Sequence, residues 1–301
     1  MKLIHGDCLE ELKKLGDSSV DCVVTSPPYW ALRLYGDSEK ELGQEKTVQE
    51  YISNLINIFN EVKRVLKDGG TCWVNLGDTY GTQSGGLREG KFGKNTNAQK
   101  LTQPKSVHKC LCQIPSRFAI AMTDNGWILR NEIIWYKRSC MPESVKDRFT
   151  VDYEKIFFFV KSKKYYFEQQ FEDTKTIDNY VRDRDNTKLN NTPGRSRMGG
   201  LKTNHYTKRN MRCVWDVTTK PSPIKHYAMY PQTLVERMIK SGCPEKGIVL
   251  DPFMGAGNTL ICAKKLIRDG IGIELYGNYF EMAEKRIRET STLFGGINDY
   301  R

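Results

Sequence analysis

The chain alternates short apolar runs with stretches in which apolar residues recur every three or four positions, a pattern typical of strands that alternate with helices. Strands are expected at Lys2–Ile4, Asp21–Thr25, Thr71–Asn75, Ile128–Trp135, Glu154–Val160, Ile248–Leu250 and Gly270–Ile273. The clearest helical pattern runs from Val48 to Leu66 and stops at Asp68-Gly69-Gly70. Further helices are expected from Leu9 onward and at Ser116–Asn125, Pro231–Ser241, Thr259–Leu266 and Tyr279–Glu289.

This alternation predicts an α/β protein with a doubly wound, mostly parallel sheet, because strands joined through helices pair in parallel. The strands at 128–135 and 154–160 have no clear helix between them and are expected to form an antiparallel hairpin at one edge. Residues 168–223 lack the alternation and are interpreted as an insertion that returns through Pro221-Ser222-Pro223. We therefore expect one core, made of residues 1–167 and 224–301, with the insertion between its two parts.

The formal net charge of +11 is concentrated in two segments. Gly81–Arg117 contains seven Lys or Arg and one acidic residue, and Asn186–Arg212 contains seven Lys or Arg and no acidic residue. Both are rich in Gly, Asn, Thr and Ser, which indicates long loops. Charge runs are usually only solvated loops, but this concentration of positive charge favours contact with nucleic-acid phosphates.

The longest apolar runs are only a few residues, and acidic residues follow soon after Met1, so we expect a cytoplasmic protein with neither a membrane segment nor a secretory leader. The nine cysteines are then expected to be reduced thiols. His108, Cys110 and Cys112 are too closely spaced for the paired knuckles of a zinc site, so no metal is expected there.

The segment Thr25-Ser26-Pro27-Pro28-Tyr29-Trp30 closes an apolar strand with a rigid polar and aromatic corner. Neither proline donates a backbone hydrogen bond and each fixes φ, so the carbonyls around Ser26 and Pro27 are expected to be oriented acceptors. The Ser26 hydroxyl is a further acceptor, and Tyr29 offers a stacking face. A plain loop can have the same sequence, but these groups together suit a flat base held by its amino group.

A second motif, Val249–Thr259, joins a buried strand to a glycine turn and the start of a helix. Gly255 and Gly257 allow close backbone approach to a ligand, and the helix start offers free N–H groups. Nineteen residues after Gly255, a strand ends in Glu274, whose carboxylate can accept both hydroxyls of a ribose. The third glycine of the dinucleotide fingerprint is missing, which disfavours NAD and FAD.

With these motifs the chain resembles the amino-group DNA methyltransferases that use S-adenosylmethionine, of the circularly permuted (beta) type whose catalytic motif precedes the cofactor motif. The resemblance covers nearly the whole chain in one consistent order. It also includes His5-Gly6-Asp7-Cys8, Asn75-Leu76-Gly77-Asp78, Arg130–Trp135, Met141-Pro142-Glu143-Ser144 and His226–Pro231. The resemblance implies a Rossmann-like fold in which the insertion at 168–223 recognises the target sequence of duplex DNA.

The expected site residues fall into three groups. The catalytic group is Ser26, Pro27, Pro28 and Tyr29. The cofactor group is Asp7, Asp251, Phe253, Gly255, Gly257, Thr259, Glu274 and His226, with Asp7 on the adenine amino group and the segment at His226 against the methionine part. The expected DNA contacts are Arg195, Arg197, Lys208 and Arg209.

Four acidic residues also have a purely structural interpretation. Asp7 could cap the helix that follows it, and Asp251 could stabilise its turn without touching a ligand. Glu274 could be an exposed strand end. Asp78 could line the base pocket or only cap a loop.

In the resembling family, aspartate before Pro-Pro-Tyr usually accompanies adenine N6 and serine usually accompanies cytosine N4. Ser26 therefore favours cytosine N4, with adenine N6 as the alternative. Methylation at cytosine C5 would need a cysteine nucleophile, usually after a proline, and the chain contains no Pro-Cys pair. An RNA or small-molecule amine substrate and an inactive DNA-binding protein are less favoured, because of the basic segments and the intact motifs. The recognised site, a homodimeric state and a cognate restriction enzyme are left open.

Overall fold

The computed structural model describes residues 1–81, 108–173, 208–218 and 230–290, except residues 34, 37, 39 and 141. The chain divides into two compact units. Gln169–Arg212 forms the smaller one, called here the insertion unit, and Met1–Glu168 with Cys213–Arg301 forms the larger one, called the core unit. The predicted His226, Arg195 and Arg197 lie outside the described residues.

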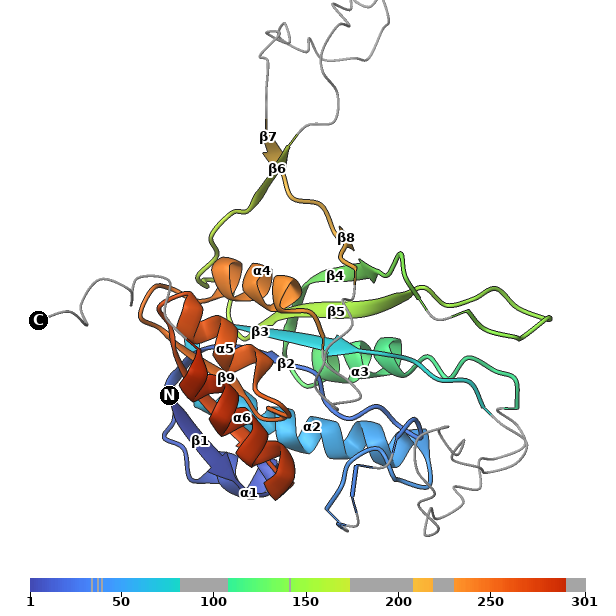
Figure 1. Ribbon diagram of the computed structural model, residues 1–301, viewed down its shortest axis with the longest axis horizontal. Coiled ribbons are helices and arrows are strands. Elements are labelled where there is room, and N and C mark those ends of the chain that lie inside the picture. The colour runs from blue at the N-terminus through green and yellow to red at the C-terminus, as the bar shows by residue number, and fades with distance from the viewer. Residues whose placement is uncertain are drawn as a thin grey trace, which may run out of the picture. The chain divides into compact units, whose positions relative to one another are not determined.

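The core unit is built on a sheet with the strand order β1-β10-β9-β2-β3-β5-β4-β8 (Figure 1). These strands are β1 (Lys2–His5), β2 (Val20–Thr25), β3 (Leu66–Leu76), β4 (Ile128–Tyr136), β5 (Tyr153–Val160), β8 (Val214–Asp216), β9 (Ile248–Asp251) and β10 (Asp269–Glu274). Strands β1, β10, β9, β2 and β3 are parallel, whereas β5 pairs antiparallel with both β3 and β4. The predicted α/β class and the antiparallel hairpin are confirmed.

Strand β8 extends the sheet beyond the hairpin, because it pairs in parallel with the outer side of β4. The sequence does not predict it, since the strand has only three residues and just the central Trp215 is buried. Its position is set by β4 rather than by its own pattern, through a hydrogen bond from the Ile134 amide to the Cys213 carbonyl of 2.8 Å.

The six described helices form two layers, one on each face of the sheet (Figure 1). Helices α1 (Cys8–Lys13), α2 (Val48–Val65) and α3 (Ile114–Asp124) pack in one layer, and α4 (Gln232–Gly242), α5 (Asn258–Lys265) and α6 (Gly277–Glu289) pack in the other. Helix α2 begins with a capping box, in which the Thr47 hydroxyl accepts from the Glu50 amide and the Glu50 carboxylate accepts from the Thr47 amide. Its apolar face, which includes Tyr51, Leu55 and Phe59, is buried in the hydrophobic core.

The end of α2 differs slightly from the prediction. The helix ends at Val65, and β3 begins at Leu66, so Asp68-Gly69-Gly70 lies inside the strand rather than after the helix. The pairing with β2 shifts in register there, from Val20↔Leu66 to Cys22↔Thr71. A Cβ on Gly70 would lie 2.5 Å from Leu66 Cδ1, so this irregular stretch needs glycine for space.

The insertion unit contains a short antiparallel pair, β6 (Phe171–Asp173) and β7 (Lys208–Asn210). Glu172 of β6 forms ion pairs with Arg209 at 2.8 Å and Arg212 at 2.9 Å. Among the helices that the structure describes in either unit, none is both long enough and apolar enough to cross a membrane.

Candidate active site

A cavity of about 610 Å³ lies in the core unit at the carboxyl ends of the parallel strands. Ser26 follows β2, the loop of Phe253 and Gly255 follows β9, Glu274 ends β10 and Asp7 follows β1, and all of these residues line the cavity. The strand connections leave β9 and β2 in opposite directions, so the cavity lies beside the point where the strand order reverses. Ligands of open α/β sheets bind in this position.

Glu274 closes the glycine turn. Its Oε2 accepts the amide of Gly255 at 2.8 Å and its Oε1 accepts the amide of Tyr276 at 3.0 Å. The residue is only 8% exposed, so the interpretation as an exposed strand end is wrong. Burial raises the pKa of Glu274, and the two amides partly oppose that rise. Each oxygen keeps acceptor capacity for a ligand in the cavity that the residue lines.

Asp251 has a structural environment and does not line the cavity. The carboxylate is 1% exposed and accepts from the hydroxyls of Thr25 at 2.7 Å, Thr259 and Tyr230, and from the amide of Phe253 at 3.1 Å. These bonds connect the end of β9 to β2 and to the start of α5. Burial nevertheless raises the pKa of Asp251.

Gly257 and Thr259 also support the turn from behind. Gly257 has a φ of +83°, and a Cβ there would lie 3.1 Å from both Ala283 Cβ and Ile287 Cδ1 of α6. Glycine at this position therefore lets α5 and α6 pack closely. Within the predicted cofactor group, the cavity is lined by Asp7, Phe253, Gly255 and Glu274.

Asp7 combines the two interpretations that the sequence left open. Its side chain caps α1 by accepting the amide of Glu10 at 3.0 Å, and the residue also lines the cavity. A carboxylate that uses one oxygen for the cap retains its other oxygen for a ligand amine.

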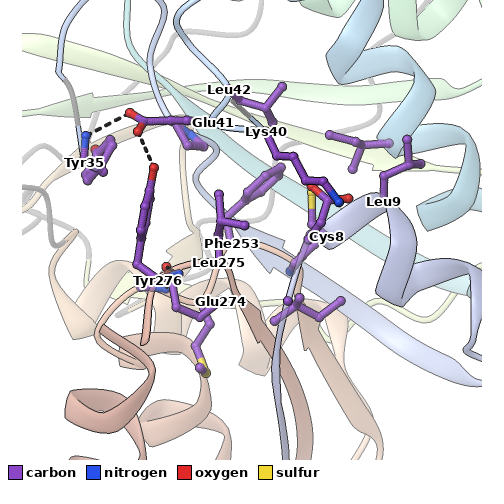
Figure 2. Close-up of a pocket in the computed structure, with 18 of the residues that line it drawn as sticks. Cys8, Leu9, Tyr35, Lys40, Glu41, Leu42, Phe253, Glu274, Leu275 and Tyr276 are labelled. Atoms are coloured by element: carbon purple, nitrogen blue, oxygen red, sulfur yellow. Dashed lines mark hydrogen bonds between the residues drawn. The ribbon is translucent and has the colours of Figure 1, made fainter. Parts of the chain in front are cut away.

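One wall of the cavity was not predicted from the sequence; it is formed by residues 35, 40–42, 44 and 45 before α2. Figure 2 shows Glu41 reaching toward Tyr35 and Tyr276. The Glu41 carboxylate accepts the amides of Tyr35 at 2.8 Å and Gly36 at 3.1 Å, and it also accepts the Tyr276 hydroxyl. Burial raises the pKa of Tyr35 to about 12. This wall has no periodic apolar pattern, so only its tertiary contacts reveal it.

The segment Ser26–Tyr29, called here the proline corner, contributes to the same cavity. Ser26 and Pro28 line it, and Pro27 is buried beside them. The Pro28 carbonyl accepts the hydroxyl of Tyr51 at 2.7 Å, which ties the corner to α2. The ring of Tyr29 packs over Gly77, where a Cβ would lie 2.4 Å from Tyr29 Cε2.

Asp78 has the capping role. Its Oδ1 accepts the amides of Thr79 at 2.9 Å and Ile114 at 3.1 Å, so it joins the end of β3 to the start of α3, and it does not line the cavity. Lys208 and Arg209 belong to the insertion unit, where Lys208 is exposed and Arg209 pairs with Glu172. Within the part of the chain that the structure describes, no three His, Cys, Asp or Glu side chains gather as a metal site.

The residues around the cavity fit a nucleoside with a polar tail. Glu274 and Asp7 offer carboxylate oxygens to hydroxyl and amine groups, and Phe253 and Tyr35 offer apolar ring surface. The volume lies within the range of small-molecule sites. Ser26 lines the same cavity and can offer its hydroxyl to a ligand bound there.

Comparison with known proteins supports this chemistry. A family model described as DNA methylase, for N6 and N4 methyltransferases, matches residues 20–285. The Type II methyltransferase M.SmaI of Serratia marcescens is 38% identical over 290 residues, which cover 95% of this chain and 90% of that protein. M.Cfr9I of Citrobacter freundii is 37% identical over 293 residues, which cover 96% of this chain and 88% of that protein.

Solved structures show the same fold. A putative DNA modification methylase from Thermus thermophilus, complexed with S-adenosyl-L-methionine, superposes with a TM-score of 0.60 at 23% identity and covers 96% of this chain and 94% of its own. The PvuII DNA methyltransferase, described as cytosine-N4-specific, gives a TM-score of 0.63 at 18% identity. The match covers 94% of this chain and 85% of that protein's chain. With the family match and the closely similar relatives, the chain belongs to the DNA methylase family of N6 and N4 methyltransferases.

Proposed function

We propose that this DNA methylase transfers the methyl group of S-adenosyl-L-methionine to the exocyclic N4 amine of cytosine in duplex DNA. The observation that carries the proposal is that Ser26 of the proline corner lines the same cavity as Glu274 and Asp7. The group that holds the amine and the groups that hold the cofactor therefore share one chamber.

The cofactor supplies a methyl group already activated on a sulfonium. Glu274 accepts the ribose hydroxyls while it keeps the glycine turn closed through the Gly255 and Tyr276 amides. Asp7 receives the adenine amino group, and Phe253 provides ring surface in the wall. These residues orient the methyl donor toward the proline corner, so that the chain contributes mainly positioning.

The exocyclic amine is a poor nucleophile because its lone pair is delocalised into the ring. Acceptors on its two N–H bonds favour a tetrahedral nitrogen, and the Ser26 Oγ and the Pro27 carbonyl are the groups proposed for this. The target base is stacked in duplex DNA and must leave the helix, which costs a few kcal/mol. Stacking on Tyr29 is proposed to offset that cost.

Cytosine N4 is preferred to adenine N6 because Ser26 precedes Pro-Pro-Tyr. A neutral hydroxyl accepts less strongly than a carboxylate, but both bases present a similar amine, so the preference rests on the Ser-Pro-Pro-Tyr pattern of the family. The cytosine-N4-specific PvuII enzyme shares the fold and is consistent with this preference. Adenine N6 is the second candidate, because the family includes both activities.

The insertion, predicted at 168–223, is proposed to recognise the DNA sequence. The compact unit Gln169–Arg212 lies within this range but ends before its predicted carboxyl-terminal boundary, and the segment's excess of Lys and Arg provides partners for phosphates. The Type II names of the relatives support a cognate restriction enzyme as a partner.

Transfer of a labelled methyl group to duplex DNA, to RNA and to buffer alone tests the substrate class. We expect incorporation only with duplex DNA. Equal labelling of RNA and duplex DNA would contradict the proposal. It would also be contradicted if the protein is folded and binds the cofactor but labels neither nucleic acid.

A further inference from the structure

Hydrogen bonds connect Ser26 of the proline corner to a carboxylate on a different strand. The Ser26 Oγ lies 3.5 Å from the Tyr29 hydroxyl, which in turn donates to Glu154 Oε2 at 2.7 Å. The Tyr29 hydroxyl also lies 3.2 Å from Asn75 Oδ1. Glu154 is on β5, 125 residues after Tyr29, and is not among the site residues predicted from the sequence.

Both partners beyond Tyr29 can only accept. An ionised carboxylate has no proton to donate, and Lys137 forms an ion pair with the other oxygen of Glu154. The amide of Asn75 is oriented by its Nδ2, which donates to the Lys155 carbonyl at 3.2 Å, so its oxygen faces Tyr29. The single Tyr29 proton is therefore donated to one of these two acceptors, Glu154 at 2.7 Å or Asn75 at 3.2 Å, and not to Ser26.

The Tyr29 hydroxyl also keeps its proton. Burial, followed by the negative charge of Glu154, raises the pKa of Tyr29 well above its ordinary value. With that proton committed, the Tyr29 oxygen can only accept from Ser26. The Ser26 proton then points to Tyr29, and the Ser26 lone pairs point away from it.

We propose that Glu154 is a positioning residue that sets the direction of this hydrogen-bond chain, so that Ser26 meets the target amine as an acceptor. The inference rests on the proposed role of Ser26 in holding that amine. It applies to either exocyclic amine, since cytosine and adenine both present N–H donors.

Replacement of Glu154 by glutamine should reverse part of the chain. Lys137 would retain the amide oxygen, so the new amide nitrogen would face Tyr29 and donate to it. Tyr29 could then donate its proton only to Asn75, and the new amide donor would compete with Ser26 for the Tyr29 oxygen. A purely structural Glu154 would instead only tie β5 to the end of β4 through Lys137, and its effect would not depend on the Tyr29 hydroxyl.

A double-mutant cycle on the full chain separates these roles. Single-turnover transfer to duplex DNA that the wild-type protein methylates is measured for Glu154→Gln, Tyr29→Phe and the double variant, together with the affinity for S-adenosyl-L-methionine and the melting temperature. We expect each single variant to be slower by roughly 10- to 100-fold, with cofactor affinity within twofold of wild type. The double variant should be no slower than Tyr29→Phe alone.

Glu132→Gln is the matched control, because Glu132 on the adjacent β4 pairs with Lys155 at 2.8 Å and is 41% exposed. It should transfer at nearly the wild-type rate. If Glu154→Gln does not fold, Glu154→Asp takes its place in the cycle. It too should slow transfer when Tyr29 is present and have no further effect in the Tyr29→Phe background.

Wild-type transfer rates in Glu154→Gln would overturn the inference, and so would losses that multiply in the double variant. Failure of the proposed function would look different, because the wild-type protein itself would then not methylate duplex DNA at cytosine N4.

Discussion

Single buried carboxylates account for much of the architecture around the cavity, and Asp251 is the clearest example. It is 1% exposed and accepts four hydrogen bonds that join β9, β2 and α5. The sequence could place it after a strand but could not separate a ligand contact from a structural one. That distinction depends on Thr25 and Tyr230, which reach it from distant parts of the chain.

The raised pKa of Asp251 predicts a specific pH dependence of stability. Because burial raises the folded-state pKa above the unfolded value, folding favours the protonated form, and stability from this group is lost as pH rises through the folded pKa. Asp251→Asn does not lose stability in this way, because asparagine does not titrate, but it cannot satisfy all the hydrogen-bond donors around this position. We expect the variant to be less stable than wild type, by a margin that shrinks as pH rises from about 4 toward 7.

Urea unfolding of the two proteins at several pH values measures this margin. The contributions of the other titrating groups to stability are common to both proteins and cancel in the comparison. A margin that stays constant or grows with pH would show that the folded-state pKa of Asp251 is not raised.

Glu274 is the residue on which cofactor binding should depend most. Glu274→Ala removes the proposed ribose acceptor and frees the amides of Gly255 and Tyr276. Loss of hydrogen bonds to a charged group predicts weaker binding of S-adenosyl-L-methionine by roughly tenfold or more. Isothermal calorimetry measures this, with Glu281→Ala on the exposed side of α6 as the control. Affinity within twofold of wild type in a folded Glu274→Ala protein would place the cofactor elsewhere.

At the scale of elements, the periodicity of apolar residues predicted those helices and strands that are determined by their own local sequence. Helix α2 has an apolar face and a capping box, and both are visible in its own residues. Strand β8 and the wall around Glu41 were missed, because their positions depend on pairing with β4 and on contact with Tyr276. In the site, the motifs located the residues near the cavity, but only the fold shows that Thr259 supports the turn from outside it.

Helix α2 also holds the proline corner in place. The hydroxyl of the fully buried Tyr51 donates to the Pro28 carbonyl at 2.7 Å. Tyr51→Phe leaves that buried carbonyl without this donor and should lower the free energy of unfolding by about 1–2 kcal/mol. Transfer should slow several-fold as the corner loosens. Tyr153→Phe is the matched control, since Tyr153 is 41% exposed. Unchanged stability and rate in Tyr51→Phe would mean that the corner is held without α2.

At the scale of the whole molecule, the proposed recognition of DNA predicts a salt dependence. Replacing Lys208 and Arg209 of the insertion unit by glutamine should weaken DNA binding and reduce the slope of log affinity against log salt by about 0.9 for each phosphate that is no longer neutralised. Arg209 also pairs with Glu172, so a Glu172→Gln variant controls for the loss of that ion pair. Binding titrations at several salt concentrations measure the slope. An unchanged slope would mean that neither residue contacts a phosphate.

The most direct test of the central claim is nucleoside mass spectrometry of unmethylated duplex DNA treated with the pure protein and S-adenosyl-L-methionine. The account predicts N4-methylcytosine as the dominant product, and roughly 10²-fold slower formation of it by Ser26→Ala with cofactor affinity nearly unchanged. N6-methyladenine as the dominant product, with no N4-methylcytosine above background, would contradict the claim.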